Sequence, residues 1–341
     1  MEKHVNIPVF IPHLGCPNDC VFCNQRIISG KKEFYADEVI PIIEEALSTV
    51  SDNCKKEIAF FGGSFTGIDK CLMENLLIIS NQYLKSGRIN SIRCSTRPDY
   101  ISADVLNILK KYNVETVELG LQSVSQDVLN LCKRGHNFDA EINATRLIKE
   151  WGFRLGGQMM IGLPGSSLED EIATAKFIVR ADCDEARIYP TIVFKDTELQ
   201  RMADRGEYNS LDLDEAVSRS AKAFAILIEG GVKVLRIGLC DSENLHSDRT
   251  YHSGPNHAAI GELVENEFYY NLICEKLQGL KFDNQSDLIL NVPIGHMSKV
   301  IGQHRKNKIR LFQRYGFRSI KVCESNNVSE YSVFLKVEER K

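Results

Sequence analysis

Three cysteines near the start of the chain have the residue type and spacing of a metal centre. Cys16, Cys20 and Cys23 form the pattern CxxxCxxC within one short segment. Three thiolates on such a segment can hold three irons of a cubane cluster, and the fourth iron then stays open to another ligand. Together with His13, the same cysteines would also satisfy a structural zinc site of the Cys₃His type. The cysteine pattern alone leaves both interpretations open.

Residues suited to ligand contact follow at the ends of later strand-like runs. Gly62 and Gly63 end one such run, and paired glycines let the backbone approach a ligand closely. Ser64 follows the glycine pair, and later runs end at Ser95-Thr96, at Gln122 and at the turn from Ile161 to Leu163. Arg134 comes soon after Gln122, and a guanidinium fork suits a carboxylate.

The first 240 residues alternate strand-like and helix-like runs. Extended runs are predicted at 6–11, 57–61, 91–96, 115–121, 154–161, 185–189 and 232–237. This βαβ alternation requires parallel strands with helices outside. The predicted fold is therefore α/β, a partial TIM-type (β/α) barrel, whose chemistry collects at the carboxyl ends of the strands. Glu118 is expected to point into such a barrel, where an isolated carboxylate is costly, so either a role in the barrel or pairing with Arg97 is expected of it.

The combined motifs resemble the radical S-adenosylmethionine (SAM) superfamily. Phe22 before the third cysteine and the glycine pair fit its signature. Across residues 5–240, the order and spacing are similar to two branches, the oxygen-independent coproporphyrinogen dehydrogenases and the radical SAM half of the Elongator catalytic subunit. The second is closer in two segments, Arg97-Pro98-Asp99 and Arg134-Gly135-His136.

This resemblance implies the cofactors and their contacts. It implies a [4Fe-4S] cluster on Cys16, Cys20 and Cys23, with SAM on the open iron and a 5′-deoxyadenosyl radical as the product of reductive cleavage. The implied SAM contacts are the backbone of Gly62, Gly63 and Ser64 to the amino group, Arg134 to the carboxylate, Gln122 with Ser95 or Thr96 to the ribose, Gln158 to the adenosine, and the turn from Ile161 to Leu163 under the adenine.

Composition bounds the setting of the protein. The chain has 341 residues, 43% of them hydrophobic, and no run of about eighteen apolar residues that would span a membrane. It shows no apolar signal-peptide core. Eight further cysteines are scattered without a pairing rhythm, which favours reduced thiols. We therefore expect a cytoplasmic protein without a membrane partner.

The chain is predicted to have three parts. These are a radical SAM barrel at 1–240, a connector loop and helix at 241–280, and a basic α/β element at 281–341. The connector histidines, His246, His252 and His257, could contact a substrate or a second cluster, but the connector loop lacks cysteines, which favours solvated loop histidines. The last part is predicted to contain a strand at 288–292, a single helix at 297–314 and a strand at 318–322.

The C-terminal part has the charge of a surface that meets an anionic partner. Residues 281–341 contain 12 Lys and Arg against 6 Asp and Glu, whereas the whole chain carries a net charge of -4. The stretch 300–309 resembles a K-homology module, whose GxxG loop clamps nucleic-acid backbone. Arg305 stands where the second glycine would be. The candidate phosphate contacts are Arg305, Lys306, Lys308, Arg310 and Arg314, and the alternative is a solvated basic helix face.

The sequence therefore favours a radical SAM enzyme acting on RNA. The Elongator resemblance implies a tRNA wobble uridine as the target and acetyl-CoA as the group donor. That subunit carries an acetyltransferase domain after its radical half and this chain ends without one, so a separate acetyltransferase or group-donor protein is an expected partner. An electron donor such as flavodoxin or ferredoxin is another. The alternatives are a small-molecule reaction, such as oxidative decarboxylation of a porphyrin, and a non-catalytic iron–sulfur RNA-binding protein.

Overall fold

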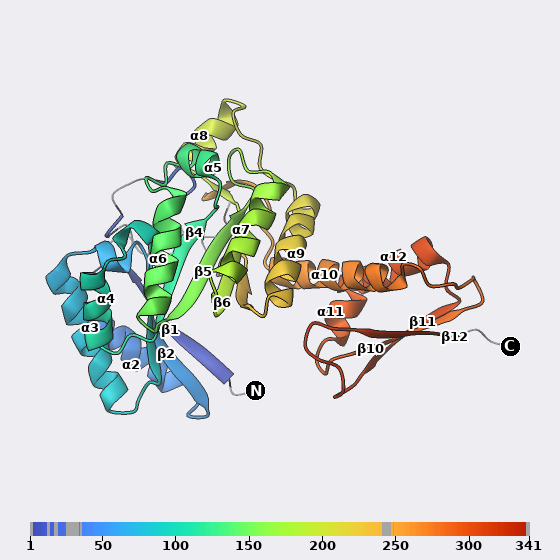
Figure 1. Ribbon diagram of the computed structural model, residues 1–341, viewed down its shortest axis with the longest axis horizontal. Helices are drawn as coiled ribbons and strands as arrows, with labels where there is room; N and C mark the ends of the chain where they lie inside the picture. Colours follow the sequence, from blue (N-terminus) through green and yellow to red (C-terminus); the bar gives the residue numbers. More distant parts are fainter. Residues whose placement is uncertain are drawn as a thin grey trace.

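A computed structural model describes residues 3–11, 14–16, 20–24, 34, 36–240, 247 and 249–338 of the protein. Its largest feature is a seven-stranded parallel sheet, in which β1 and β8 are the edges (Figure 1). In spatial order the strands are β1 (Lys3–Ile11), β2 (Cys54–Gly62), β3 (Ser91–Thr96), β4 (Thr116–Gln122), β5 (Arg154–Ile161), β6 (Glu185–Pro190) and β8 (Lys233–Ile237). The sheet curls into a half-barrel, which confirms the predicted partial TIM-type barrel.

Helices cover the outer face of this sheet. They are α2 (Val39–Thr49), α3 (Lys70–Lys85), α4 (Ala103–Lys111), α5 (Gln126–Leu131), α6 (Phe138–Glu150), α7 (Leu168–Arg180) and α9 (Leu213–Glu229), with 3₁₀ turns η1 (Ala36–Glu38), η2 (Phe65–Gly67) and η3 (Pro98–Tyr100). Several begin at a side-chain cap, as where the Ser167 hydroxyl and the Asp170 carboxylate close a capping box on α7. Because all the strands of this sheet are parallel, their carboxyl ends lie at one end of the barrel.

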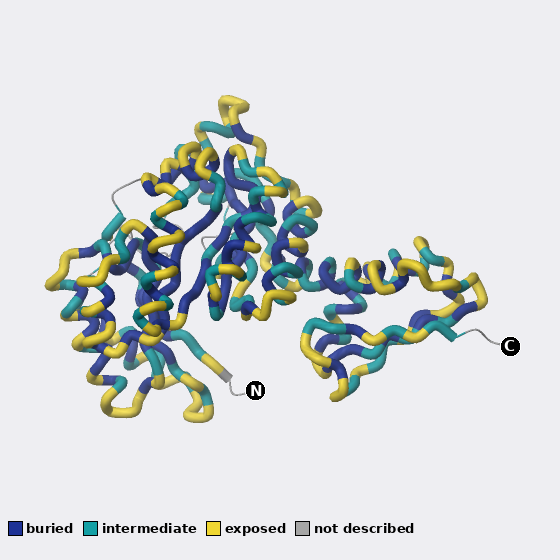
Figure 2. Tube along the Cα trace, viewed as in Figure 1, coloured by how far each residue is buried: buried dark blue, intermediate teal, exposed yellow. Residues whose placement is uncertain are grey.

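The two faces of the sheet have opposite character because side chains alternate along a strand. Ile58, Phe60 and Ile92 are fully buried in the core beneath the helices. Glu57 and Arg93, on the same two strands, face the barrel interior, where they form a salt bridge. Figure 2 shows these central strands as the buried layer of the fold. The face of the sheet under the helices is therefore apolar, whereas the interior face carries charged side chains.

Glu118 is at the centre of a buried ionic network inside the barrel. Its carboxylate accepts hydrogen bonds from Arg93 Nη1 at 3.2 Å, Arg187 Nε at 2.6 Å and Gln158 Nε2 at 2.7 Å. The expected pairing with Arg97 is wrong. Arg97 comes just after the end of β3, and its guanidinium pairs with Asp99 instead. The neighbouring Gly156 leaves room for this carboxylate, since a Cβ there would lie 2.8 Å from Glu118 Cγ.

The C-terminal α/β element is attached through a long helix, α10 (Ile260–Leu277), which packs on α9 (Figure 1). Its sheet has the order β11-β10-β12, with β10 parallel to β11 and antiparallel to β12. The elements after α10 are β10 (Asp287–Val292), α11 (Met297–Ile301), η4 (Gln303–Arg305), α12 (Lys306–Tyr315), β11 (Ser319–Glu324) and β12 (Phe334–Glu338). Buried side chains of this element and of the barrel belong to one continuous core.

The prediction of one helix over 297–314 is wrong. The chain breaks into α11 and α12 because Gly302, His304 and Arg305 all have positive φ angles, of 78°, 51° and 62°. Left-handed backbone cannot continue a right-handed helix. The result is a helix–loop–helix whose loop holds the exposed Arg305.

The sequence analysis also missed four short elements. They are β7 (Val193–Phe194), α8 (Glu198–Asp204), β9 (Tyr251–Ser253) and β12. β7 and β9 pair as a small antiparallel ribbon near the mouth of the barrel. Within the described ranges, no helix is both long enough and apolar enough to cross a membrane.

Candidate functional site

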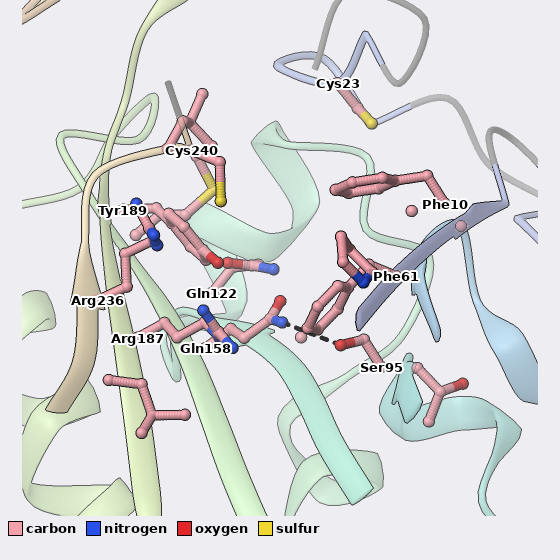
Figure 3. A pocket seen from close by; sticks show the side chains of 18 of the residues that line it. Phe10, Cys23, Phe61, Ser95, Gln122, Gln158, Arg187, Tyr189, Arg236 and Cys240 are labelled. Atoms are coloured by element: carbon pink, nitrogen blue, oxygen red, sulfur yellow. Dashed lines mark hydrogen bonds between the residues drawn. The ribbon is translucent and has the colours of Figure 1, made fainter. Parts of the chain in front are cut away.

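A cavity of about 870 Å³ lies inside the half-barrel, and every strand of the barrel contributes to its lining. Cys16, Cys20 and Cys23 all line it. Figure 3 shows Cys23 above the cavity, with side chains from β1, β2 and the later strands pointing inward beneath it. The predicted cysteine segment and the predicted strand ends therefore meet at one space.

Close backbone packing holds the cysteine segment over the end of β2. Ile11 at the end of β1 is the register partner of Gly62, and its carbonyl accepts a hydrogen bond from Gly63 N at 2.8 Å. A Cβ on Gly63 would lie 2.0 Å from the Leu14 carbonyl oxygen, and one on Gly15 would lie 2.2 Å from the Ser64 carbonyl oxygen. Only glycine fits at such approaches. The glycine pair therefore positions the cysteines.

Arg134 reaches the cysteines from the opposite wall. It is only 6% exposed, so its guanidinium is buried in the wall. Its Nη1 donates to Cys20 Sγ at 3.3 Å, and its Nη2 donates to the Gly120 carbonyl at 2.5 Å. The side chain thus places a fixed positive charge beside the Cys20 thiol.

Gln122 has an unusual backbone conformation at the end of β4. Its φ is 72°, and the ladder between β4 and β5 shifts register between Gly120 and Gln122. Its Oε1 is buried and has no hydrogen-bond partner among the described residues. A strained, non-glycine residue with an unpaired buried acceptor is typical of a ligand contact.

Three other predicted contacts already bond to protein groups. Gln158 Nε2 donates to Glu118 at 2.7 Å and lies 3.4 Å from Ser95 Oγ, the contact drawn in Figure 3. The Thr96 hydroxyl lies 2.6 Å from that of Thr66. All three side chains line the cavity. Ser64 lies 3.8 Å from Cys16 Sγ, at the cysteine end.

The turn from Ile161 to Leu163 lies outside the residues that line the cavity. Its backbone groups are bonded elsewhere: Thr191 Oγ1 donates to the Ile161 carbonyl at 2.7 Å, Tyr208 donates to the Gly162 carbonyl at 2.7 Å, and Gly162 N donates to Glu171 at 2.7 Å. The adenine contact that the resemblance assigns to this turn stays a prediction.

The two Elongator-like segments meet behind Arg134. Arg97 forms a two-point pair with Asp99, at 2.9 Å for each contact, and donates to the Arg134 carbonyl. His136 is buried with its Nε2 3.0 Å from Glu141 Oε1. Burial and the nearby Arg134 lower the pKa of His136 to about 3, and burial raises the pKa of Glu141. These residues therefore support Arg134 from behind. His136 itself does not line the cavity.

The cavity also contains side chains that the sequence analysis did not single out. Figure 3 labels the most prominent, Phe10, Phe61, Arg187, Tyr189, Arg236 and Cys240. In the sequence, the aromatic residues among them cannot be distinguished from ordinary strand residues. Arg187 carries the one available signal, because a charge within a predicted buried strand demands a partner.

The connector histidines do not join this site in the described part of the chain. His246 lies outside the described residues. His252 Nε2 is 3.0 Å from Asp204, and His257 Nδ1 accepts from Ala259 N at 3.1 Å. Neither lines the cavity.

The predicted phosphate contacts divide into two groups. Arg310 pairs with Glu267 of α10 at 2.5 Å and lies over the Tyr270 ring, and Arg314 Nη1 lies 3.8 Å from Cys274 Sγ. These two contact the long helix. By contrast, Arg305, just before α12, and Lys306, the first residue of α12, are exposed, and Lys308 lies 6.0 Å from the Phe312 ring centre.

The three thiols suit an iron–sulfur cluster by their chemistry, since thiolates are its usual protein ligands. Their shared cavity, the positive charge of Arg134 and the unpaired Gln122 acceptor beside them fit a cluster with a bound polar ligand. Among the residues that the structure describes, no three His, Cys, Asp or Glu side chains converge as ligands of a single metal ion. His13, the remaining member of the zinc set, lies outside those residues.

Comparison with known families agrees with the cysteine signature. The model of the radical SAM superfamily matches residues 10–178, and that of the radical SAM C-terminal domain matches residues 183–270. An uncharacterized protein from Methanocaldococcus jannaschii is 31% identical over 233 residues, which cover 64% of this chain and 70% of the relative.

A tRNA uridine(34) acetyltransferase from Methanocaldococcus infernus is also similar, with 34% identity over 193 residues. The match covers 51% of this chain but only 36% of that enzyme, so the chain spans about a third of its length. The solved structure of Elp3 from the same organism, lacking its N-terminus, has a TM-score of 0.62 at 23% identity and covers 85% of this chain and 71% of that one. This likeness shows a shared fold. By its sequence matches, the chain belongs to the radical SAM superfamily of enzymes.

Proposed function

We propose that this protein binds a [4Fe-4S] cluster through Cys16, Cys20 and Cys23, cleaves SAM reductively and modifies a tRNA uridine. The observation that carries the proposal is the meeting of three thiols, the Arg134 guanidinium and the unpaired Gln122 acceptor at one cavity. The names of the acetyltransferase relatives support the uridine target.

The residues of the chain divide the work. When bound, the cluster and SAM supply the radical chemistry. Arg134 is fixed so that its guanidinium can also meet the carboxylate of SAM. Gln122 offers Oε1 to a ribose hydroxyl. The glycine pair exposes backbone groups to the amino end, and the barrel wall shields the reacting atoms from water.

Replacing Arg134 with alanine should weaken SAM binding by about 1.5–3 kcal/mol, the contribution of a charge-assisted hydrogen bond. This corresponds to a roughly tenfold to hundredfold rise in Kd. Anaerobic calorimetry on reconstituted protein measures it, with iron content unchanged. The matched control is Arg146→Ala, which removes an exposed arginine paired with Glu150 on α6. An unaltered SAM affinity in Arg134→Ala would show that this residue was assigned wrongly.

The position of the basic loop, the turn around Arg305 and Lys306 between α11 and α12, supports RNA as the substrate. Lys306 lies 3.4 Å from Asp214 at the start of α9, and Gln303 lies 3.3 Å from Glu262 in the first turn of α10. α9 follows β6, so its start lies at the carboxyl ends of the strands. The loop therefore lies beside the same end of the barrel as the cysteines.

A double Arg305→Ala, Lys306→Ala variant should bind tRNA with a flatter salt dependence. Each lost phosphate contact reduces the log–log slope by roughly 0.7–0.9, the single-strand and duplex limits. Filter binding across a salt series measures the slope, and Lys222→Ala, an exposed lysine on α9, is the control. If the double variant binds tRNA as tightly as the parent at every salt concentration, this loop is no phosphate contact.

One experiment tests the proposed reaction. Anaerobic protein with a reconstituted cluster receives SAM and reductant, and 5′-deoxyadenosine is measured alone, with bulk tRNA and with a porphyrin. Stimulation by tRNA is the expected result. Stimulation only by the porphyrin would favour a small-molecule reaction, and no 5′-deoxyadenosine at all would favour a non-catalytic iron–sulfur protein.

A further inference from the structure

Part of the cavity is not used by the proposed SAM contacts. Its lining also includes Phe10, Phe61, Arg187, Tyr189 and Arg236, whose side chains point into the space in Figure 3. The described lining includes several arginine and lysine side chains but no aspartate or glutamate. A cavity wall of this charge favours an anionic occupant.

Arg187 has an unused donor in this space. The residue is 6% exposed, and its Nε already donates to Glu118 at 2.6 Å. Its guanidinium carbon lies 5.3 Å from the centre of the Phe61 ring. Its Nη2 is buried without a hydrogen-bond partner among the described residues. Buried donors are normally paired, so this one indicates an acceptor supplied from outside the chain.

Arg236 stands directly beside Arg187 in the sheet. The two residues are register partners across the β6–β8 ladder, and both line the cavity. Like charges opposite each other on neighbouring strands are destabilising. Arg187 has Glu118 as a counter-ion, whereas no carboxylate contact to Arg236 is found within the described residues. An anion between the two guanidinium groups would remove the repulsion.

The aromatic side chains give this occupant a second feature. The Phe10 and Phe61 rings are half-buried, with centroids 6.1 Å apart. Half-exposed aromatic rings on a cavity wall are stacking surfaces for planar groups such as nucleobases. Because Arg187 lies over Phe61, a planar ring and an oxyanion of one molecule can be held together here.

We propose that Arg187 and Arg236 form an oxyanion subsite, which holds a phosphate or carboxylate of the reacting substrate while its planar ring lies against Phe10 and Phe61. The inference deepens the proposed function, on which it rests for the idea that a substrate reacts in this cavity. The binding itself requires no turnover, so it can be measured separately.

Two matched pairs of probes test the subsite on the full-length reconstituted protein. Uridine 5′-monophosphate against uridine reports a phosphate, and phenylacetate against phenylacetamide reports a carboxylate. The parent should bind the charged member of at least one pair about tenfold or more tightly than its neutral partner, as a charge-assisted contact provides. Preference in the first pair points to a nucleotide, and preference in the second points to a small acid.

The variants decide whether these arginines are responsible. Arg236→Ala removes an exposed side chain and should abolish the preference. Arg187→Lys keeps a charge beside Glu118 but loses the guanidinium fork, and should reduce it severalfold. Arg180→Ala, an exposed arginine at the end of α7, should leave it intact. Thermal unfolding confirms that each variant is folded.

Two results would overturn the subsite: a parent that does not distinguish charged from neutral probes, or a preference that survives in both folded variants. Failure of the proposed function looks different. If no 5′-deoxyadenosine forms but the arginine-dependent preference is present, the reaction is wrong and the subsite stands. If 5′-deoxyadenosine forms without that preference, the subsite alone falls.

Discussion

Cys20→Ser is expected to lose most of its iron and all SAM cleavage. The parent, reconstituted without oxygen, should hold about four irons per chain and be brown. Cys20 is buried, and its Sγ accepts a hydrogen bond from Arg134. A serine hydroxyl is a poor substitute for a thiolate, and a site with only three protein ligands has none to spare. Iron and sulfide analysis with 5′-deoxyadenosine assays measures both losses.

Cys71→Ser is the control for this result, because Cys71 is an exposed cysteine on α3 outside the cavity lining. It should keep the iron content and the activity of the parent. Full iron content in Cys20→Ser would remove this residue from the ligand set. Stoichiometric zinc in the parent, with no iron taken up, would instead restore the structural zinc interpretation.

Glu118→Gln is expected to reduce the free energy of unfolding by about 3–5 kcal/mol, the cost of breaking a buried ion pair from one side. The carboxylate is 1% exposed and pairs with both Arg93 and Arg187. Glutamine leaves Arg187 without its counter-ion. Its NH₂ group would also face one of the N–H donors whose hydrogen bonds the Glu118 carboxylate accepts. Denaturant unfolding followed by circular dichroism measures the change.

The matched control for this prediction is Glu150→Gln, which neutralises a half-exposed carboxylate paired with Arg146. Exposed pairs contribute about 0–1 kcal/mol, so the control should change stability little. If the two variants are equally stable, the barrel network contributes no more than a surface pair, and Arg187 does not depend on Glu118 for its charge balance.

Local patterns predicted the strands of the barrel and the glycine pair beside the cysteine segment, because both depend on residues that are close together in the sequence. Gly63 is an example. It belongs to the glycine pair, and the Leu14 carbonyl that it contacts belongs to the cysteine segment, so both residues lie in segments that the sequence had already identified. The partner of Glu118 was not predictable in this way. Arg93 lies within β3 and Arg97 directly follows the strand, and only the register of β3 against β4 decides which of them reaches the carboxylate.

Two other features were beyond the reach of sequence patterns for a similar reason. The break between α11 and α12 depends on left-handed backbone at His304 and Arg305, residue types that usually continue a helix. The neighbouring positions of Arg187 and Arg236 depend on a bulge in the β6–β8 ladder, where the register shifts between Ala186 and Arg187. Such irregularities arise from the packing of the whole sheet.

Because the barrel is incomplete, the protein needs a way to prevent its free strand edges from pairing with those of another copy. β1 and β8 each leave one side unpaired within the described sheet, and exposed strand edges can recruit a strand from another molecule. Pro8 in β1 has no N–H to offer such a strand, and a proline is tolerated only on an edge. Lys233 and Arg236 place charges on β8. The barrel can therefore stay open between β1 and β8 without these strand edges causing aggregation.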